Sequence, residues 1–359
     1  MLAGQRALGR EGCRRGNRHE RDGNRGRQYH LPMLLAGDIG GTKTLLGLFE
    51  PTGDRPRSMV VREYATLDFD SLDELIQVFL DDTRAEPHLR GFCLGVAGPV
   101  TGLVARLTNV PWLADASGFA DRWPDCSVRL LNDLEAMAHA VPVLEPEELA
   151  VLQAGVPVPS GNAALIAAGT GLGEALLHNV SGTFVPSASE GGHADFAART
   201  PRELAFVEHL SGIFGRVDLD RVISGPGLAH LFRFTHGFGA TGGLCPAIGP
   251  GIDNGELPAA ISASALAGRC EQCAEAVEMF VEAYGAAAGN LALRSMATAG
   301  LYIGGGIAPK LLPALEKGQF LDAFRAKDPL VDLMRTIPVS VILNSAAGLL
   351  GAAVVAAEE

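Results

Sequence analysis

The stretch GDIGGTKT, residues 37–44, combines a carboxylate, two glycines and a hydroxyl in a spacing suited to binding phosphate. It differs from the Walker A loop because Thr42 stands where that motif has its second glycine. Only LLGLFE then separates it from the next turn, which is too short for the helix that a Walker loop needs. The flanking apolar residues instead predict a β-hairpin with Gly40 and Gly41 at its tip. The glycines let backbone amides approach phosphate, Thr42 adds a donor, and Asp38 can hold hydrated Mg²⁺. An ordinary Gly-Gly hairpin with a solvated Asp38 is the alternative.

A second stretch, AALIAAGTGLGEALLHN, repeats this arrangement. Gly169, Thr170 and Gly171 lie between two apolar runs, so we expect another hairpin. The dinucleotide pattern G-x-G-x-x-G fails here because Glu174 holds its last position and no helix follows at once. Two phosphate hairpins, one in each half of the chain, suggest a duplicated α/β unit with the nucleotide between the copies.

A carboxylate that could act as a base occurs in SVRLLNDLEAMAHAV. This segment predicts a strand over 127–131, then Asn132 and Asp133, then a helix. Open α/β sheets bind ligands beyond the carboxyl ends of their strands, where an Asp is available as a base. The alternative is that Asn132 or Asp133 only caps the helix.

Two further segments have residues suited to a polyol and to a nucleotide base. In SASEGGHADFA, Glu190 and His193 enclose two glycines, and a carboxylate with an imidazole can form paired hydrogen bonds to vicinal hydroxyls. These two residues could also be ordinary surface residues. In GLYIGGGIAPKLLPAL, an apolar strand precedes a glycine run and a helix with a proline near its start. The glycines would let a flat base lie against the backbone, or they form a tight strand-to-helix turn. The glycines are Gly304, Gly305 and Gly306, and the proline is Pro309.

Composition and charge limit the classes of function. The 359 residues are 47% apolar, enough for a large core and two domains of ordinary size. The longest nearly apolar run, residues 346–357, is too short for a membrane-spanning helix of about 20 residues. The net charge is −12, and residues 1–30 hold eight arginines and three acids, so the remainder carries −17. We therefore expect no membrane insertion and no binding of nucleic acid by the general surface.

The N-terminal extension, residues 1–32, is rich in Arg, Gly and Asn and lacks hydrophobic periodicity, so we expect it to be disordered. It has no apolar region typical of a signal peptide. The six cysteines form no disulfide framework in a chain of this length, which favours a reducing cytoplasm. Cys270 and Cys273 form a C-x-x-C at a predicted helix, but without a second cysteine pair or nearby His they are interpreted as packed thiols.

The order of these segments resembles the bacterial glucokinase family, the hexokinase group of the actin, Hsp70 and sugar kinase superfamily. The resemblance runs from about Leu34 to the C-terminus and rests on GDIGGT, LLNDLEAMAHAVP, GTGLG, EGGHADFA, RVISGPGL, GNLAL and GGGIAPK. It implies a two-lobed α/β fold of the actin-like ATPase (ribonuclease H-like) type, with the ligand cleft between the lobes. It also implies phosphorylation of glucose at its 6-hydroxyl, with ATP as the phosphoryl donor and Mg²⁺ as the cofactor.

The resemblance also implies roles for single residues. Asp133 is the base, and Asn132, Glu190 and His193 hold the sugar together with an acid just before SGPGL. That acid is Asp220 here, where the family more usually has Glu. The first hairpin and the second match the family's phosphate motifs, and Gly304 to Gly306 match its adenosine motif. Lys43 is a departure from close relatives, and it could reach a phosphate or face solvent. The related repressor and kinase group has a cysteine-rich zinc motif soon after the sugar-site His, but this chain has no cysteine between Cys126 and Cys245, so no structural zinc is expected.

The expected domains are a small lobe over 33–143, a large lobe over 144–340, and a C-terminal helix within 341–359 that returns to the small lobe. We expect residues 236–258, rich in Gly and Pro, to form a surface loop. A homodimer is implied by the resemblance only. The alternatives are a kinase for another hexose and a non-catalytic sugar sensor; the presence of Asp133 and the lack of a helix-turn-helix pattern disfavour the sensor.

Overall fold

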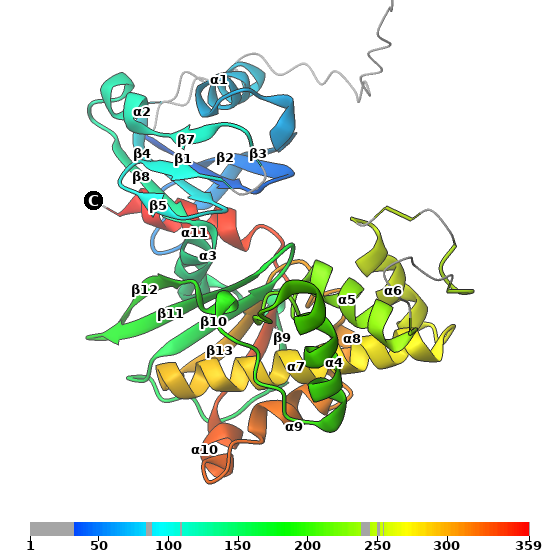
Figure 1. Ribbon diagram of the computed structural model, residues 1–359. Helices are drawn as coiled ribbons and strands as arrows, with labels where there is room; N and C mark the ends of the chain where they lie inside the picture. Colours follow the sequence, from blue (N-terminus) through cyan, green and yellow to red (C-terminus); the bar gives the residue numbers. More distant parts are fainter. Residues whose placement is uncertain are drawn as a thin grey trace, which may run out of the picture.

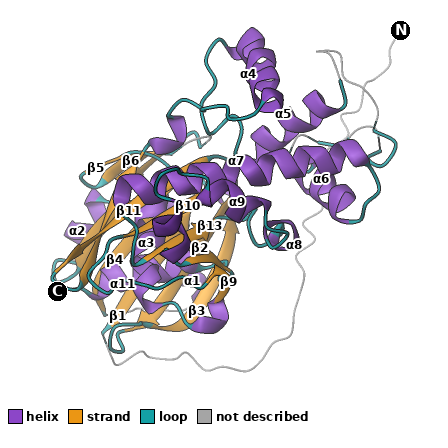
Figure 2. Cartoon of the chain, turned by 90° about the horizontal axis from the view of Figure 1, so that it is seen from below, coloured by secondary structure: helices purple, strands orange, loops and turns teal. Residues whose placement is uncertain are grey.

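The computed structural model describes residues 32–83, 88–107, 110–237, 245–249, 252–253 and 255–358. The predicted disorder of residues 1–32 therefore lies outside the described residues, apart from Pro32. Figure 1 shows two stacked bodies, each built on its own sheet, with α3 and α11 between them. Seen from below, helices α4, α5 and α6 gather to one side of the sheets (Figure 2).

The first sheet has five strands in the order β3-β2-β1-β4-β8. Its centre is a buried apolar strand, β1, which pairs antiparallel with β2 and parallel with β4. β3 pairs with β2, and β8 extends the parallel side beyond β4. The bounds are β1 (Met33–Ile39), β2 (Lys43–Glu50), β3 (Arg57–Ala65), β4 (Leu89–Val96) and β8 (Ser127–Asn132).

The outer face of this sheet is covered by a small additional layer. Three short strands form a sheet in the order β5-β6-β7. Apolar side chains of this layer and of two helices pack with Phe92 and Leu94 of β4 in one core cluster. The elements are α1 (Leu72–Thr83), β5 (Val100–Thr101), β6 (Val104–Arg106), β7 (Leu113–Asp115) and α2 (Ser117–Arg122).

The second sheet has six strands in the order β12-β11-β10-β13-β14-β9. Again a buried central strand, β10, pairs antiparallel with the next strand in the chain and parallel with a later one. This repeats the arrangement around β1, so the predicted duplication of an α/β unit is confirmed. The strands are β9 (Leu149–Gln153), β10 (Ala163–Ala168), β11 (Leu172–Val180), β12 (Thr183–Ser189), β13 (Gly300–Gly304) and β14 (Val339–Ile342).

Helices of the second half cover one face of this sheet. The longest, α7, begins after its N-cap Cys270 and ends where Met296 takes a left-handed conformation. Its apolar face packs in the largest core cluster, together with Ala164 and Ile166 of β10. The helices of this half are α4 (Pro201–Phe214), α5 (Gly225–Thr235), α6 (Leu257–Leu266), α7 (Glu271–Ser295), α8 (Leu312–Leu315), α9 (Gln319–Arg325) and α10 (Val331–Thr336).

Two helices join the sheets. The C-terminal helix α11 (Ala347–Ala357) packs Leu349 and Val355 against Leu34 of β1, while its Leu350 belongs to a cluster with Leu165 of β10. Its partner is α3 (Asp133–Ala140); α11 consists mostly of Ala and Gly, and α3 buries Ala136, Ala138 and Ala140. This composition lets the two helices approach closely in the layer between the sheets. The division into lobes at about residue 143 itself stays a prediction.

Two expectations about local structure are wrong. Pro309 does not start a helix, because residues 305–311 form consecutive turns and α8 begins only at Leu312. The segment 236–258 is not simply a surface loop, since Cys245 and Ile248 are buried in the main core cluster and Leu257 already belongs to α6. Part of this segment is therefore anchored by apolar side chains.

The described helices also bear on the membrane question. None of them combines the length and the hydropathy that a membrane crossing needs.

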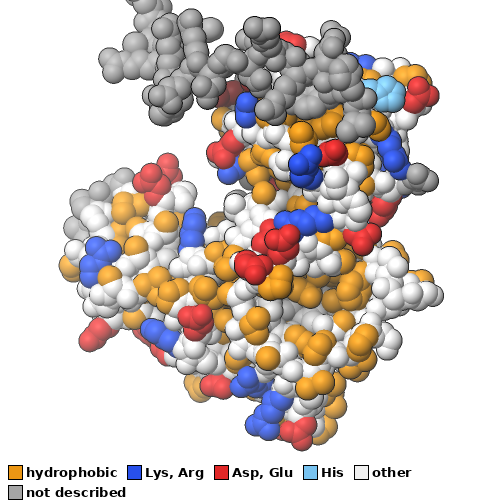
Figure 3. Space-filling view, turned by 180° about the vertical axis from the view of Figure 1, so that it is seen from behind, with side chains coloured by type: hydrophobic (Ala, Val, Ile, Leu, Met, Phe, Trp, Pro, Cys, Tyr) orange, Lys and Arg blue, Asp and Glu red, His pale blue; other side chains and the backbone are white. Residues whose placement is uncertain are grey.

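On the face drawn in Figure 3, acidic and basic side chains are interspersed, and the outline is indented between the upper and lower bodies. Five cysteines lie in the described residues, and all five are free thiols.

Candidate active site

Asp133 begins α3 directly at the carboxyl end of β8. The preceding Asn132 is the N-cap, and its Oδ1 accepts hydrogen bonds from the amides of Leu134 at 3.0 Å and Glu135 at 3.4 Å. Its side-chain amide donates to the carbonyl oxygen of Gly98 at 3.3 Å. The capping role considered for this pair is therefore present, and it fixes Asp133 in the first turn of the helix.

The environment of Asp133 makes its carboxyl group more basic than an ordinary aspartate. Burial raises the pKa of Asp133 to about 6, hydrogen bonds from backbone amides such as that of Leu134 oppose this, and the negative charge of Glu190 adds to the rise. Glu190 is far from Asp133 in sequence, yet the fold places it near enough for its charge to act on this carboxyl group. A carboxylate with this pKa is ionised at neutral pH and can still accept a proton from a hydroxyl.

Asp38 lies near the end of β1 and contributes a second partly buried carboxylate. Burial raises its pKa to about 6, the charge of Asp133 adds to this, and Lys43 opposes it. The start of α11 lies against it, because a Cβ added at Gly348 would be 2.7 Å from Asp38 Oδ2. The carboxylate of Asp38 supplies hard oxygen donors of the kind that Mg²⁺ prefers, so this residue fits the ion.

The first glycine turn is the predicted β-hairpin, with the Gly40 amide donating to the Lys43 carbonyl oxygen at 3.0 Å. Its tip is held by Thr66, a residue that the sequence analysis missed. The Thr66 amide donates to the Thr42 carbonyl oxygen at 3.0 Å, and its hydroxyl donates to the Gly40 carbonyl oxygen at 2.8 Å. Thr66 also bonds the buried hydroxyl of Thr44 at 2.9 Å. It follows a separate strand, so no local pattern links it to the hairpin.

Lys43, which departs from the pattern of close relatives, forms an ion pair with Glu63. Its Nζ lies 2.6 Å from Glu63 Oε2 on the adjacent strand β3, and both side chains are more than half exposed. An exposed pair of this kind contributes little to stability. In this structure Lys43 therefore points along the sheet surface toward Glu63.

The second glycine turn is also a hairpin, closed by the Gly169 amide donating to the Gly171 carbonyl oxygen at 2.8 Å. Asp220 Oδ1 accepts the amide hydrogen of Leu172 at 2.7 Å, and the Gly225 amide donates to the Gly169 carbonyl oxygen at 2.8 Å. Asp220 thus supports the hairpin through one of its carboxylate oxygens. Its predicted contact with the sugar stays a prediction and would fall to Oδ2.

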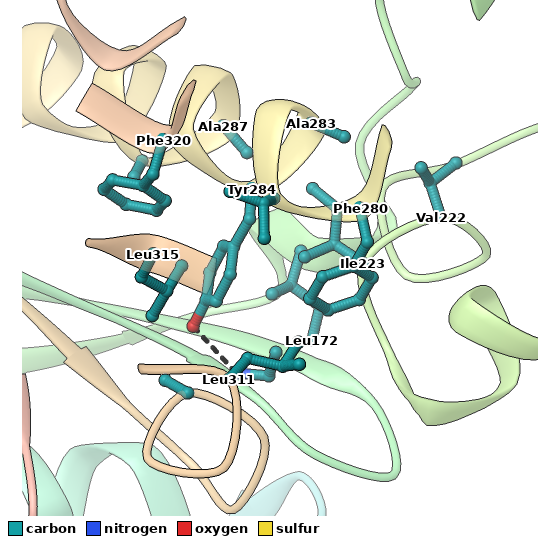
Figure 4. Close-up of a cluster of buried hydrophobic side chains, with 14 of the residues drawn as sticks. Leu172, Val222, Ile223, Phe280, Ala283, Tyr284, Ala287, Leu311, Leu315 and Phe320 are labelled. Atoms are coloured by element: carbon teal, nitrogen blue, oxygen red, sulfur yellow. Dashed lines mark hydrogen bonds between the residues drawn. The ribbon is translucent and has the colours of Figure 1, made fainter. Parts of the chain in front are cut away.

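The strand that leads into this hairpin is supported from behind by Tyr284 of α7. The buried phenol oxygen accepts the amide hydrogen of Ala168 at 3.1 Å and donates to the Ile166 carbonyl oxygen at 3.3 Å. Figure 4 shows the ring among Leu311, Leu315 and Phe320, with the hydrogen bond to the strand drawn as a dashed line. The hairpin therefore rests on the main hydrophobic core.

Glu190 precedes a short 3₁₀ helix (Gly191–His193), His193 is the last residue of that helix, and both side chains are exposed. His193 Nδ1 lies 3.7 Å from Oδ2 of Asp218, a buried carboxylate that the sequence analysis missed. Asp218 is itself held by the Arg221 amide, which donates to Oδ1 at 3.0 Å. The alternation in VDLDR, with acids two residues apart, was the signal that could have indicated Asp218 beside Asp220.

The third glycine turn follows β13 and lies against the end of β10. Gly305 has φ +82°, a conformation that favours glycine, and a Cβ on it would be 2.4 Å from the Ala168 carbonyl oxygen. The same oxygen accepts the Ile307 amide hydrogen at 3.3 Å. The predicted adenosine motif, Gly304 to Gly306, therefore adjoins the second glycine hairpin.

Helix α3 connects these parts because it touches both sheets. A Cβ added at Gly95 of β4 would be 2.7 Å from Ala136 Cβ, and one added at Gly173 of β11 would be 2.6 Å from Leu134 Cδ2. A Cβ at Gly304 would likewise be 2.7 Å from Met137 Sδ. Asp133 thus stands at the start of the helix that bridges the two glycine-hairpin sheets.

Comparison with known proteins identifies the family. A sequence model of the glucokinase family matches residues 35–359. The chain belongs to the glucokinase family. A curated glucokinase of Synechocystis is 39% identical over 347 residues, covering 90% of this chain and 98% of that protein. The present chain is therefore a sugar kinase, and the prediction that it is an ATP:sugar phosphotransferase is confirmed.

Solved structures agree with the fold. The crystal structure of glucokinase from an Antarctic psychrotroph has a TM-score of 0.78 at 30% identity and covers 91% of this chain and 99% of its own. A glucokinase of the ROK family from Streptomyces griseus, solved with glucose and AMPPNP, has a TM-score of 0.60 at 18% identity and covers 90% of this chain and 99% of its own. The predicted actin-like ATPase fold, a two-lobed α/β architecture, is therefore confirmed.

Proposed function

We propose that this enzyme transfers the γ-phosphoryl group of ATP to the 6-hydroxyl of D-glucose, giving glucose 6-phosphate and ADP. The observation that carries the proposal is Asp133, a partly buried carboxylate with a pKa of about 6 at the carboxyl end of β8, near enough to Glu190 and Asp38 for their charges to interact. The names of the related proteins support glucose as acceptor, and the AMPPNP complex of the Streptomyces griseus protein supports ATP as donor.

In the proposed mechanism Asp133 accepts the proton of the sugar hydroxyl. The hydroxyl oxygen forms a bond to the γ-phosphorus, the bond between this phosphorus and the β,γ-bridging oxygen breaks, and ADP leaves. Such a base contributes about 10²- to 10⁴-fold to the rate. Asn132, Glu190, His193 and the free oxygen of Asp220 bind the remaining hydroxyls and orient the acceptor.

The glycine turns bind the nucleotide. Backbone amides of the tips at 40–42 and 169–171 hold the phosphates, with the hydroxyls of Thr42 and Thr170 as further donors. Gly304, Gly305 and Gly306 accommodate the adenosine. Asp38 would hold Mg²⁺ through water, and the bound ion would neutralise the charge that spreads over the phosphate oxygens. Closure of the lobes on glucose would exclude water, a competing acceptor.

Four expectations about location, partners and substrate selectivity remain predictions. A cytoplasmic location suits the free thiols, and a homodimer and the lack of nucleic-acid partners stay predictions. Selectivity for glucose over other hexoses also stays a prediction, because the same ligand types can bind several hexoses.

A coupled assay with ATP and a panel of hexoses tests the function on the parent, Asp133→Asn and Glu147→Gln. Glu147 is an exposed carboxylate outside the site and serves as the charge-matched control. We expect Asp133→Asn to lower kcat by roughly 10²- to 10⁴-fold while calorimetric binding of glucose persists, and Glu147→Gln to match the parent. Turnover of glucose by Asp133→Asn near the parental rate would disprove the role of the base. Glucose binding without turnover in the parent would indicate a sensor.

A further inference from the structure

Four potential metal ligands from three separate parts of the chain meet at one point far from the active-site residues in sequence. They are His236, which ends α5, Cys245, Cys270, which caps α7, and Cys273 in its first turn. Their ligand atoms all lie within 4.8 Å of one another. The interpretation of Cys270 and Cys273 as thiols without a nearby His or further cysteine is therefore wrong, because the fold brings His236 and Cys245 to them.

The distances inside this cluster agree with those around a tetrahedral metal. Cys245 Sγ lies 3.7 Å from Cys270 Sγ and 3.9 Å from Cys273 Sγ, and Cys270 Sγ lies 3.4 Å from His236 Nε2. With Zn–S bonds of about 2.3 Å and a Zn–N bond of about 2.0 Å, tetrahedral geometry separates two sulfurs by about 3.8 Å and a sulfur and nitrogen by about 3.5 Å. These three distances match a tetrahedral zinc site, and no pair of ligand atoms in the cluster is more than 4.8 Å apart.

The imidazole of His236 is oriented for ligation. Its Nδ1 lies 2.8 Å from the Phe232 carbonyl oxygen. A carbonyl oxygen only accepts, so Nδ1 carries the hydrogen, and Nε2, the nitrogen beside Cys270, presents its lone pair to the cluster. A backbone acceptor on the far nitrogen is the usual support of a metal-bound histidine.

The surroundings of the sulfurs also suit thiolates. The backbone amide of Cys273 donates to Cys270 Sγ at 3.5 Å, at the N-terminus of α7, where the helix dipole favours negative charge. The buried hydroxyl of Ser264 lies beside the sulfur of Cys273. A metal-bound thiolate would give that hydroxyl an acceptor.

We propose that His236, Cys245, Cys270 and Cys273 form a structural zinc site. Three sulfurs and one imidazole nitrogen exclude Mg²⁺ and Ca²⁺, which require oxygen ligands, and a tetrahedral set of this kind suits Zn²⁺. Four protein ligands leave no open position for a substrate, so the role is structural. The C-x-x-C provides two ligands at the spacing common in zinc sites. The sugar-site His193 and its neighbours take no part.

The bound zinc would tie together the C-terminus of α5, the N-terminus of α7 and the segment around Cys245. Thr235 already bridges the two helices, its hydroxyl donating to the Gln272 carbonyl oxygen at 2.9 Å. The opposite end of α5 carries Gly225, whose amide bonds Gly169 of the second phosphate hairpin. Zinc at one end of α5 therefore stabilises the helix that supports the hairpin at its other end.

The test starts with the full-length protein, purified without chelator and analysed for metals by plasma mass spectrometry. We expect about one zinc ion per chain. After zinc removal, added Co²⁺ should give the thiolate charge-transfer and tetrahedral d–d absorption bands. A parent protein that contains no zinc and gives no such bands with Co²⁺, or mass spectrometry showing a disulfide among these cysteines, would overturn the proposal.

Matched variants assign the ligands. Cys270→Ser and Cys273→Ser should each hold roughly tenfold less zinc than the parent under competition with a chelator. Cys126→Ser, which changes a buried cysteine of the first sheet's core, should keep the parental zinc content. The melting temperature of the parent should fall with chelator and recover with zinc, whereas that of Cys270→Ser should not respond. Equal zinc in Cys270→Ser, Cys273→Ser and Cys126→Ser would contradict the assignment even if all fold.

Discussion

Asp38 and Asp133 lie at the carboxyl ends of β1 and β8, on opposite sides of β4, and the charge of Asp133 contributes to the raised pKa of Asp38. Gly95 of β4 is paired with Asp38, and a Cβ at Gly95 would lie 3.6 Å from the Cα of Asp133 and 2.7 Å from Ala136 Cβ. The missing side chain lets α3 settle against β4. The two carboxylates are thereby placed close enough to interact, as the proposed roles of base and cation ligand require.

The pH dependence of kcat/KM should follow these two carboxyl groups. Burial raises the pKa of Asp133 and of Asp38 to about 6, so both are protonated in acid and ionised at neutral pH. Because a base must be ionised to accept a proton, kcat/KM should fall as the pH drops through about 6. If both carboxyl groups must be ionised for activity, kcat/KM should fall more steeply with pH than it would for the protonation of a single group. Initial rates across the acid range measure it, with circular dichroism to exclude unfolding; a limb centred near pH 4 would contradict the raised pKa.

Thr66→Val should weaken nucleotide binding without touching the sugar. The substitution removes the hydroxyl that bonds the Gly40 carbonyl oxygen and Thr44, so the first hairpin loses its support. At about 1 kcal/mol for each lost hydrogen bond, kcat/KM for ATP should fall roughly 5- to 30-fold. Steady-state kinetics with each substrate varied provide the measurement.

The matched control for Thr66→Val is Thr52→Val. Thr52 is exposed, and its hydroxyl donates to the Arg55 carbonyl oxygen in a turn outside the site. This variant should keep the parental kinetics. If Thr66→Val raised the KM for glucose as much as that for ATP, the hydroxyl would be supporting the whole fold rather than the hairpin.

Asp218→Asn should affect the sugar side of the site through His193. Asp218 is a positioning residue, because its carboxylate lies 3.7 Å from His193 Nδ1 and is itself fixed by the Arg221 amide. Losing the charge should free the exposed imidazole and raise the KM for glucose by roughly 10-fold or less, with a smaller effect on kcat. The KM for ATP provides the internal comparison, and Asp332→Asn is the control at an exposed carboxylate. An unchanged KM for glucose would refute this role.

The parts of the site that the sequence predicted are those encoded within one short segment. Gly40 and Gly41 between apolar runs specify a hairpin locally. Asp133 lies at the junction of a strand and a helix that follow each other directly. Hydrophobic periodicity and turn-forming residues are therefore sufficient to predict both features. The helix expected at Pro309 failed because the glycine turn packs against Ala168, a tertiary contact that continues the turns to Leu311. Local pattern contains no information on that contact.

The missed residues act across long sequence separations. Thr66 reaches the hairpin from the end of β3, Asp218 reaches His193 from beyond α4, and Cys245 reaches Cys270 through the packing of α5 and α7. Each is an ordinary residue in its own segment and gains its role only from the fold. The residues next to the C-x-x-C in sequence therefore give no sign of a metal site, although His236 and Cys245 are present elsewhere in the chain.

Gly351→Ala should disturb the packing of α11 against α3, and Gly212→Ala provides a matched helical control. A Cβ at Gly351 would lie 1.7 Å from the Ala136 carbonyl oxygen and 3.0 Å from the Ala140 amide nitrogen, so one of the helices must move. Overpacking of this kind costs about 1–3 kcal/mol. Gly212 is exposed in α4 with no atom within 4 Å of the added carbon, so alanine there should leave the stability unchanged or raise it by up to about 1 kcal/mol.

Thermal melting of the two glycine variants measures the contrast, and kinetics add a second readout. Because α3 carries Asp133 in its first turn, a shift of this helix should lower kcat in Gly351→Ala but not in Gly212→Ala. Equal melting temperatures in the two variants would mean that α11 can move away from α3 at no cost. A lower melting temperature with unchanged kcat would place the adjustment in α11 alone, with the first turn of α3 held in place by the Asn132 cap.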